Sequence, residues 1–300
     1  MRPQRLFAVG PRSPRRYPLR MRFLPLPGTG ETPVRVMTIA GSDSGGAAGL
    51  QSDLRTFALA GVHGTSAVTA VTVQNSLGVT GFHPIPPETV AGQIRAVVQD
   101  IGVGAVKTGM LATAEIIDAI ADTAQELSIG ASIPFLVDPV CASQHGDPLL
   151  TPEALATLLN RLFPLAHLVT PNLDEVRLIT GIDVVDDATQ RDAARALHAL
   201  GPRWALVKGG HLRTASNSTD VLYDGADFLE FEAPRLDTRH DHGAGDTLGA
   251  ATVCALAHGY DVPEAVAFGK EWVTRSLAAA YPVGAGHGPV NASWRLRELP

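Results

Sequence analysis

The chain has 300 residues, of which 45% are hydrophobic, so it can bury a large core as one α/β domain or as two small ones. Seven of its 24 basic residues fall within residues 1–30, where there is no acid, and the rest of the chain carries 17 basic against 30 acidic residues. This acidic body argues against a nucleic-acid partner, and no apolar run is long enough to span a bilayer.

Residues 1–32 form an extension rich in Arg and Pro that shows no sustained periodicity. Its acid-poor composition is similar to that of a transit peptide, but the prolines would break an amphipathic helix. An arm that binds nucleic acid or membrane is the alternative. We expect a disordered N-terminal extension over residues 1–32 and one domain over residues 33–300.

From Val34 onward, short β-rich runs alternate with helical ones, which predicts a mostly parallel sheet covered by helices on both faces. The expected strands are 34–40, 65–73, 104–110, 133–139, 167–171 and 204–210. The expected helices are 50–60, 88–100, 114–127, one from Pro152, one from Leu173, 188–200, 245–258 and 263–280. An Asp-Gly pair between two alternating runs predicts a β-hairpin over 221–233, at one edge of the sheet.

Polar or Gly-rich segments follow each of the six expected strands. In chain order they are AGSDSGG, VQN, KTGM, DPV, TPN and KGGH. Ligands bind beyond the carboxyl ends of the strands in a parallel sheet. These segments therefore predict one ligand site along this edge, and residues 41–49 and 141–148 are candidates for a loop that closes over it.

The segment HGAGDT (242–247) runs directly into the apolar stretch 248–256. Its small residues let the backbone approach a ligand closely, and the free N–H groups at the start of the following helix form an anion site. A carboxylate at Asp246 suits phosphoryl transfer, because it can take the proton of a hydroxyl that attacks a bound phosphoryl group. The alternative is a Gly-rich turn in which Asp246 only caps the helix.

Two common nucleotide motifs and a disulfide pattern are absent from the sequence. No GxxxxGK[ST] occurs, which excludes a P-loop protein. Gly243, Gly245 and Gly249 are spaced GxGxxxG, which is one residue off the dinucleotide-binding fingerprint GxGxxG, and they lie too near the C-terminus to open a first βαβ unit. Both facts argue against a dehydrogenase. Cys141 and Cys254 lie in apolar contexts without metal-like or disulfide-like spacing, so we expect a reduced, cytoplasmic setting.

Seven segments between about Val34 and Val290 carry a family resemblance. They are AGSDSGGAAGLQSDLRTFALAG, AVTVQNSLGV, KTGML, DPVCAS-x-x-GDPLL, TPNLDE, VKGGH and GHGPV. Together they resemble the hydroxymethylpyrimidine/phosphomethylpyrimidine kinases of thiamine biosynthesis, a branch of the ribokinase superfamily. The resemblance implies a three-layer α/β/α fold, a homodimer, ATP as phosphoryl donor and Mg²⁺ as cofactor. It also implies phosphorylation of 4-amino-5-hydroxymethyl-2-methylpyrimidine, and then of its monophosphate to the pyrophosphate.

The pyrimidine pocket of that family falls on the first half of the chain. Gly41 and Asp53 match positions that approach or hydrogen-bond the substrate ring, and Gln74 matches the side chain that reads the aminopyrimidine edge. Met110 and Val140 match apolar contacts to the ring. Glutamine suits its role because one amide offers both a donor and an acceptor. The alternatives are that Asp53 is a solvated acid on a helix face and that Met110 is a core residue.

The phosphate-binding side of the family falls on the second half. Asn172 and Glu175 match Mg²⁺–ATP positions, with Glu175 acting mainly through metal-bound water, although the same segment also has the pattern of a helix start. Asp138, at a strand end, is a further metal candidate. Lys208 matches a position near the ATP phosphates, where a cation offsets developing charge. The anion hole falls on Gly243, Ala244 and Gly245.

The chain departs from the resemblance at the catalytic position. Many family members have GTGC there, with a cysteine beside the substrate hydroxyl, whereas this chain has GAGD, as do the sugar kinases of the superfamily. The residues that precede this loop, HDH (240–242), also stand where the family usually has a Thr-containing segment. We therefore expect Asp246 to be the catalytic base. Two alternatives stay open: a pyridoxine or pyridoxal kinase, and a non-catalytic protein that binds the pyrimidine.

Overall fold

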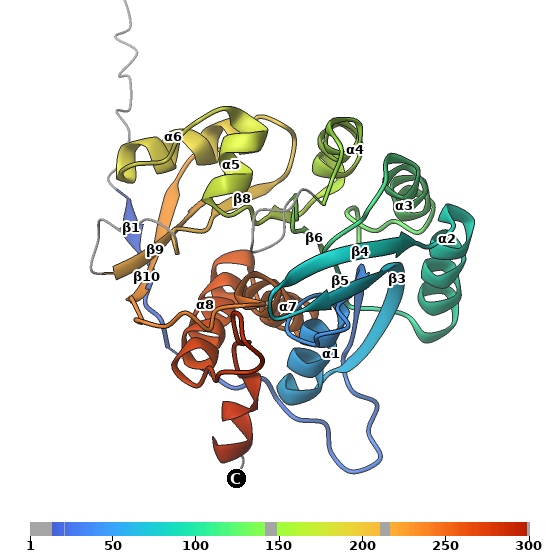
Figure 1. Ribbon diagram of the computed structural model, residues 1–300, viewed down its shortest axis with the longest axis horizontal. Coiled ribbons are helices and arrows are strands. Elements are labelled where there is room, and N and C mark those ends of the chain that lie inside the picture. Colours follow the sequence, from blue (N-terminus) through green and yellow to red (C-terminus); the bar gives the residue numbers. More distant parts are fainter. Residues whose placement is uncertain (1–13, 21, 142–148, 211–216, 299–300) are drawn as a thin grey trace, which may run out of the picture.

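A sheet of ten strands runs through the described part of the computed structural model, which comprises residues 14–20, 22–141, 149–210 and 217–298 (Figure 1). The strand order is β1-β10-β9-β8-β7-β6-β5-β2-β3-β4. The strands are β1 (Arg15–Arg16), β2 (Arg35–Ser42), β3 (His63–Asn75), β4 (Gly78–Pro84), β5 (Ala105–Thr108), β6 (Phe135–Val137), β7 (Leu168–Val169), β8 (Trp204–Val207), β9 (Asn217–Tyr223) and β10 (Phe228–Pro234).

Strands β8, β7, β6, β5, β2 and β3 pair in parallel with their neighbours in this order. Strand β9 pairs antiparallel with β8, and β4 pairs antiparallel with β3. The short central strands are buried along their whole length, as β6 (FLV) illustrates. Phe135 and Val137 face one layer of helices, and Leu136 between them faces the other. This arrangement confirms the predicted three-layer α/β/α fold with a mostly parallel sheet.

Helices form a layer on each face of the sheet (Figure 1). They are α1 (Gly49–Ala60), α2 (Pro87–Ala96), α3 (Ala114–Glu126), α4 (Pro152–Thr157), α5 (Leu173–Thr180), α6 (Asp187–His198), α7 (Ala244–Ala257) and α8 (Val262–Ala278). The apolar residues of α2 to α6 pack in one hydrophobic cluster, and those of α1, α7 and α8 pack in the other. π-Helical turns extend α2 and α4, over Val97–Ile101 and Leu158–Leu162.

Helix α7 is buried along most of its length, because it lies between the sheet and α8. Gly269 lets α8 approach closely, since a Cβ there would lie 2.2 Å from Thr252 Oγ1 on α7. Helix α7, whose first turn belongs to HGAGDT, is thereby packed closely against α8. No helix among the described residues has the length and apolar content needed to cross a membrane.

Antiparallel hairpins form at both sides of the parallel strands. The predicted hairpin over 221–233 is confirmed as β9 and β10, and Gly225 takes the positive φ of +97° that their turn requires. A second hairpin, between β3 and β4, was not predicted from the sequence. Strand β4 (GVTGFHP) is largely exposed and contains few apolar residues, so its pattern gave no strand prediction.

The predicted disorder of residues 1–32 is wrong for the described part of that segment, although residues 1–13 and Met21 lie outside the described residues. Strand β1 pairs in parallel with β10, and Tyr17 N donates to Glu230 O at 2.8 Å. Leu24 is buried in the same cluster as α8, and Arg16 forms an ion pair with Glu232 at 2.9 Å. The apolar and basic residues of this segment cover an acidic sheet edge that would otherwise be open.

Candidate active site

A cavity of about 910 Å³ opens beyond the carboxyl ends of the parallel strands, beside the start of α7. The predicted site residues that line it are Gly41, Gln74, Met110, Asp138, Val140, Asn172, Glu175, Lys208, Gly243, Ala244, Gly245 and Asp246. Among the predicted residues, Asp53 does not line the cavity. Residues 142–148 and His211, which belong to two of the motifs, lie outside the described residues.

The first turn of α7 forms one wall of the cavity. Gly243 has a φ of +79°, and a Cβ at this position would lie 2.0 Å from Ala47 O, so only glycine fits. The Ala244 N–H donates to Asp241 O at 3.1 Å and therefore is not a free donor, contrary to the prediction. The N–H groups of Gly245 and Asp246 have no acceptor inside the helix and lie at its positive end. These two N–H groups are therefore free to donate to an anion.

Asp246 contacts a buried lysine that the sequence analysis did not single out. Lys107 Nζ lies 3.3 Å from Asp246 Oδ1, and 2.8 and 2.9 Å from the two carboxylate oxygens of Asp53. Lys107 and Asp53 have no exposed side-chain surface. Burial alone would lower the pKa of Lys107, but the carboxylates of Asp53, Asp246 and Asp138 outweigh it and raise this pKa. Asp246 is therefore held beside a fixed ammonium group.

The prediction that Asp53 contacts the substrate ring is wrong in this structure. Its carboxylate binds Lys107 and accepts a hydrogen bond of 2.6 Å from Thr38 Oγ1, below the floor of the cavity. Burial raises the pKa of Asp53 to about 7, against the opposing effect of Lys107. The one sequence signal for this pair was a lysine that directly follows the apolar residues Ala105 and Val106 in strand β5 (AVKT).

Lys208 and Asp138 face the anion site from the sheet side. Lys208 Nζ lies 3.0 Å from Asp138 Oδ1, which also accepts a hydrogen bond from Thr170 Oγ1 at 3.1 Å. A Cβ on Gly245 would lie 3.3 Å from Lys208 Nζ, so this ammonium group is adjacent to the helix start. Burial would lower the pKa of Lys208, but Asp138 and Glu175 outweigh it and raise this pKa. A cation therefore persists where an anion would bind.

Glu175 fits both of the interpretations that the sequence allowed. It forms a capping box with Asn172, in which Glu175 N donates to Asn172 Oδ1 at 2.9 Å and Asn172 N donates to Glu175 Oε2 at 2.7 Å. Both residues also line the cavity. Burial raises the pKa of Glu175 to about 8, while Lys208 opposes this shift.

The donor set also fits Mg²⁺ bound together with a nucleotide. Among the described residues, no three His, Cys, Asp or Glu side chains converge as a metal cage. Mg²⁺ does not need such a cage, because it binds through one or two carboxylates together with phosphate oxygens and water. Asp138 and Glu175 are two carboxylates that line the cavity beside Lys208.

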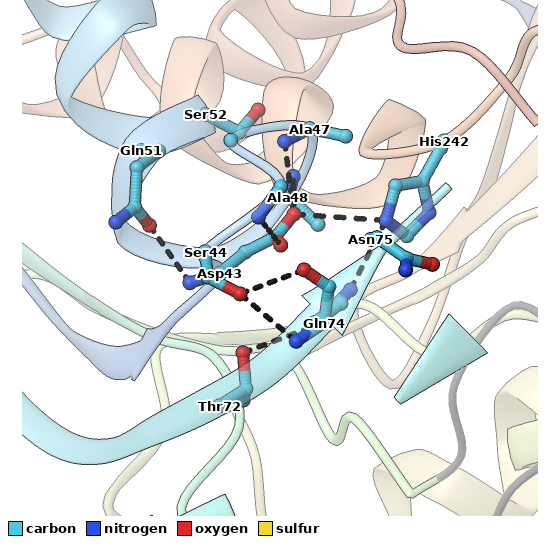
Figure 2. Close-up of polar contacts among 12 residues, drawn as sticks. Asp43, Ser44, Ala47, Ala48, Gln51, Ser52, Thr72, Gln74, Asn75 and His242 are labelled. Carbon is cyan, nitrogen blue, oxygen red and sulfur yellow. Dashed lines mark hydrogen bonds and ion pairs between the residues drawn. The ribbon is translucent and has the colours of Figure 1, made fainter. Parts of the chain in front are cut away.

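The cavity lining includes a further buried carboxylate, Asp43, which sequence reasoning missed (Figure 2). Asp43 accepts hydrogen bonds from the N–H groups of Gly45, Ala47 and Ala48 at 2.7, 2.8 and 2.8 Å. Burial would raise the pKa of Asp43, but His242 and these N–H groups outweigh it and lower this pKa. Asp43 thus fixes the loop that leads into α1, on the side of the cavity where Gln74 and His242 lie.

Replacement of Asp43 by asparagine should lower the free energy of unfolding by about 1–3 kcal/mol at pH 7, because an amide NH₂ would then face backbone N–H groups. The folded pKa of Asp43 lies below the value of 3.8 for an unperturbed Asp. Its stabilising contribution is therefore present above about pH 4 and is lost as the pH falls through the folded pKa. Urea unfolding at pH 7 and pH 3 measures both effects, with exposed Asp100→Asn as the control. Equal stability of variant and wild type at pH 7 would contradict this role.

Comparisons with known proteins agree with this geometry. A family model described as phosphomethylpyrimidine kinase matches residues 43–291. The hydroxymethylpyrimidine/phosphomethylpyrimidine kinase of Mycobacterium leprae is 63% identical over 275 residues, which cover 90% of this chain and 98% of the relative. Among solved structures, phosphomethylpyrimidine kinase from Clostridium difficile matches at 36% identity with a TM-score of 0.72, covering 81% of this chain and 99% of its own. The ADP complex of Bacillus subtilis pyridoxal kinase matches at 35% identity with a TM-score of 0.81, covering 89% and 100%.

Proposed function

Because the chain belongs to the phosphomethylpyrimidine kinase family, we propose that it transfers the γ-phosphoryl group of ATP to a pyrimidine alcohol. The alcohol is 4-amino-5-hydroxymethyl-2-methylpyrimidine, and a second transfer converts the monophosphate to the pyrophosphate used in thiamine biosynthesis. One observation carries the proposal: the carboxylate of Asp246 lines the same cavity as Gln74 and Lys208. The proposed base, the amide proposed to read the heterocycle and the cation proposed to face the phosphates therefore line one cavity.

In the proposed reaction, the hydroxymethyl group of the substrate lies against Asp246, which accepts the hydroxyl proton as the oxygen attacks the γ-phosphorus in line. Lys107 holds the carboxylate in place from below, at 3.3 Å. The N–H groups of Gly245 and Asp246 and the ammonium of Lys208 receive the charge that develops on the phosphoryl oxygens. Asp138 and Glu175 would hold Mg²⁺, which offsets phosphate charge when it is bound.

Gln74 supports the choice of substrate, because an amide can pair with both the ring nitrogen and the amino group of an aminopyrimidine. Replacing Gln74 by alanine should raise KM for the pyrimidine alcohol about 5- to 150-fold, since a lost polar pair in a buried site costs about 1–3 kcal/mol. Steady-state kinetics of ADP release measures the change, and exposed Gln99→Ala is the matched control. An unchanged KM would remove Gln74 from substrate recognition.

Pyridoxal kinase is the second candidate function, and the similarity to the Bacillus subtilis enzyme motivates it. Purified full-length protein should be assayed for ADP release from Mg-ATP with four acceptors: the pyrimidine alcohol, its monophosphate, pyridoxine and ribose. Turnover of the first two supports the proposed function. Turnover of pyridoxine alone would assign the chain to vitamin B6 phosphorylation and overturn it.

We further propose a cytoplasmic homodimer. Val71 and Val73 are 48% and 64% exposed on the face of β3 that points away from the cavity, where a second copy of the chain would cover them. Cys141 and Cys254 are free thiols, as suits a reducing compartment. Sedimentation of the wild type and of Val73→Lys tests the assembly, because a charge at a covered apolar face should produce monomers.

A further inference from the structure

The hydroxyl group of Thr72 determines how the side chain of Gln74 is oriented. Thr72 Oγ1 lies 2.8 Å from the carbonyl oxygen of Ser42 and 3.2 Å from the side-chain amide of Gln74. A hydroxyl has one proton to donate, and a carbonyl oxygen can only accept. The proton of Thr72 therefore goes to Ser42 O. The Gln74 atom that faces Thr72 must then be a donor. In the structure this atom is Oε1; a half-turn of the side-chain amide exchanges its oxygen and nitrogen, and we assign the NH₂ group to this place.

After this half-turn the amide oxygen takes the place of Gln74 Nε2, which lies 3.2 Å from His242 Nε2. An amide oxygen only accepts, so His242 must carry its hydrogen on Nε2. The same nitrogen lies 3.7 Å from Asp43 Oδ2, a carboxylate oxygen that also only accepts. Without the half-turn, the single proton of Thr72 would face two acceptors, Ser42 O and Gln74 Oε1. The His242 lone pair that accepts from Gln74 Nε2 would also lie near the Asp43 carboxylate. The half-turn gives one donor and one acceptor at each of the three hydrogen-bond contacts, which join Thr72 to Ser42, Gln74 to Thr72 and His242 to Gln74.

The backbone of Gln74 is fixed as firmly as its side chain. Ser44 Oγ accepts a hydrogen bond from Gln74 N at 2.8 Å and donates to Gln74 O at 2.7 Å. The pairing of β3 with β4 shifts register between Val73 and Gln74, and a β-bulge of this kind re-aims the side chain beside it. Figure 2 shows Gln74 between Thr72 on its own strand and His242 on the segment that leads into α7.

We propose that His242, as its Nε2–H tautomer, is a positioning residue that determines substrate specificity through Gln74. With one N–H engaged by Thr72 and one oxygen lone pair engaged by His242, the amide keeps one donor and one acceptor for the ligand. This pair matches a ring nitrogen adjacent to a carbon that carries an amino group. Pyridoxine has a methyl group on the carbon next to its ring nitrogen, and so offers no donor there. The inference rests on the proposed function and specifies what the cavity selects.

The tautomer can be measured without enzyme activity. In full-length protein with ¹⁵N- and ¹³C-labelled histidine, the His242 signals are those missing from the spectrum of His242→Gln. At pH 8 we expect hydrogen on Nε2 and none on Nδ1. A neutral Nδ1–H form would overturn the inference. Because this result does not depend on turnover, it stays informative even if the pyrimidine alcohol proves not to be the substrate.

Kinetics separates positioning from a general structural role. His242→Leu should lower kcat/KM for the pyrimidine alcohol about 5- to 100-fold, mainly through KM, while kcat/KM for pyridoxine changes little. His242→Gln, whose NH₂ can occupy the place of Nε2–H, should restore most of the discrimination. In a Gln74→Ala background, His242→Leu should add little. Equal losses for both alcohols, or additive effects of the two substitutions, would overturn the role, and thermal unfolding verifies that each variant is folded.

Discussion

Replacing Asp246 by asparagine should lower kcat by about 10²–10⁴-fold and leave KM for the pyrimidine alcohol nearly unchanged, because a general base contributes rate and not ground-state binding. Asparagine preserves the shape of the side chain but cannot accept the hydroxyl proton. The fold should persist in this variant, since Lys107 keeps its buried partner Asp53 at 2.8 Å. The loss can therefore be assigned to the chemical step.

The measurement is single-turnover phosphoryl transfer with saturating Mg-ATP, which separates the chemical step from product release. Exposed Asp237→Asn, on the segment that precedes α7, is the control and should retain the wild-type rate. If Asp246→Asn also retains that rate, Asp246 is a helix-capping residue and the base must be sought elsewhere. If KM rises instead while kcat is unchanged, the carboxylate binds substrate and takes no proton.

Replacing Lys107 by methionine should destabilise the protein by about 3–5 kcal/mol, because removal of one partner leaves a buried carboxylate without a counter-ion. The double variant Asp53→Asn/Lys107→Met should recover most of this loss. It removes both charges together, and the amide oxygen introduced at position 53 can still accept the hydrogen bond that Thr38 donates at 2.6 Å. The double variant should nevertheless remain slow, since nothing then holds Asp246 in place.

Urea unfolding of the wild type and of both variants measures these differences. The matched control is Arg95→Met, which breaks an ion pair of the same 2.8 Å length between side chains that are 41% and 45% exposed. Solvent screens that pair, so its loss should have little effect. If Lys107→Met proves no more destabilising than Arg95→Met, the buried ion pair does not support the site. Recovery of stability together with full activity in the double variant would show that Lys107 does not position Asp246.

Sequence alone determined the layered fold and most of the cavity lining. Alternating apolar runs define parallel strands, and the carboxyl ends of such strands meet at one edge by geometry. For that reason Asp138, Asn172 and Lys208, each found at or just after the end of a predicted strand, do lie in one cavity. Asp246 was predictable from a local pattern as well, because small residues before a buried helix indicate a free helix start.

Only the tertiary structure decided which polar side chains meet. A helix-face acid has the same sequence pattern whether it faces water or a buried lysine, so Asp53 was misplaced: its partner Lys107 is 54 residues away. Gln74 and His242, which are 168 residues apart, meet because the β3 bulge and the start of α7 converge on the cavity. The edge strands β1 and β4 escaped prediction for a related reason. Each of them forms only because a neighbouring strand has an open edge, and the periodicity of a short segment does not indicate whether such an edge is present.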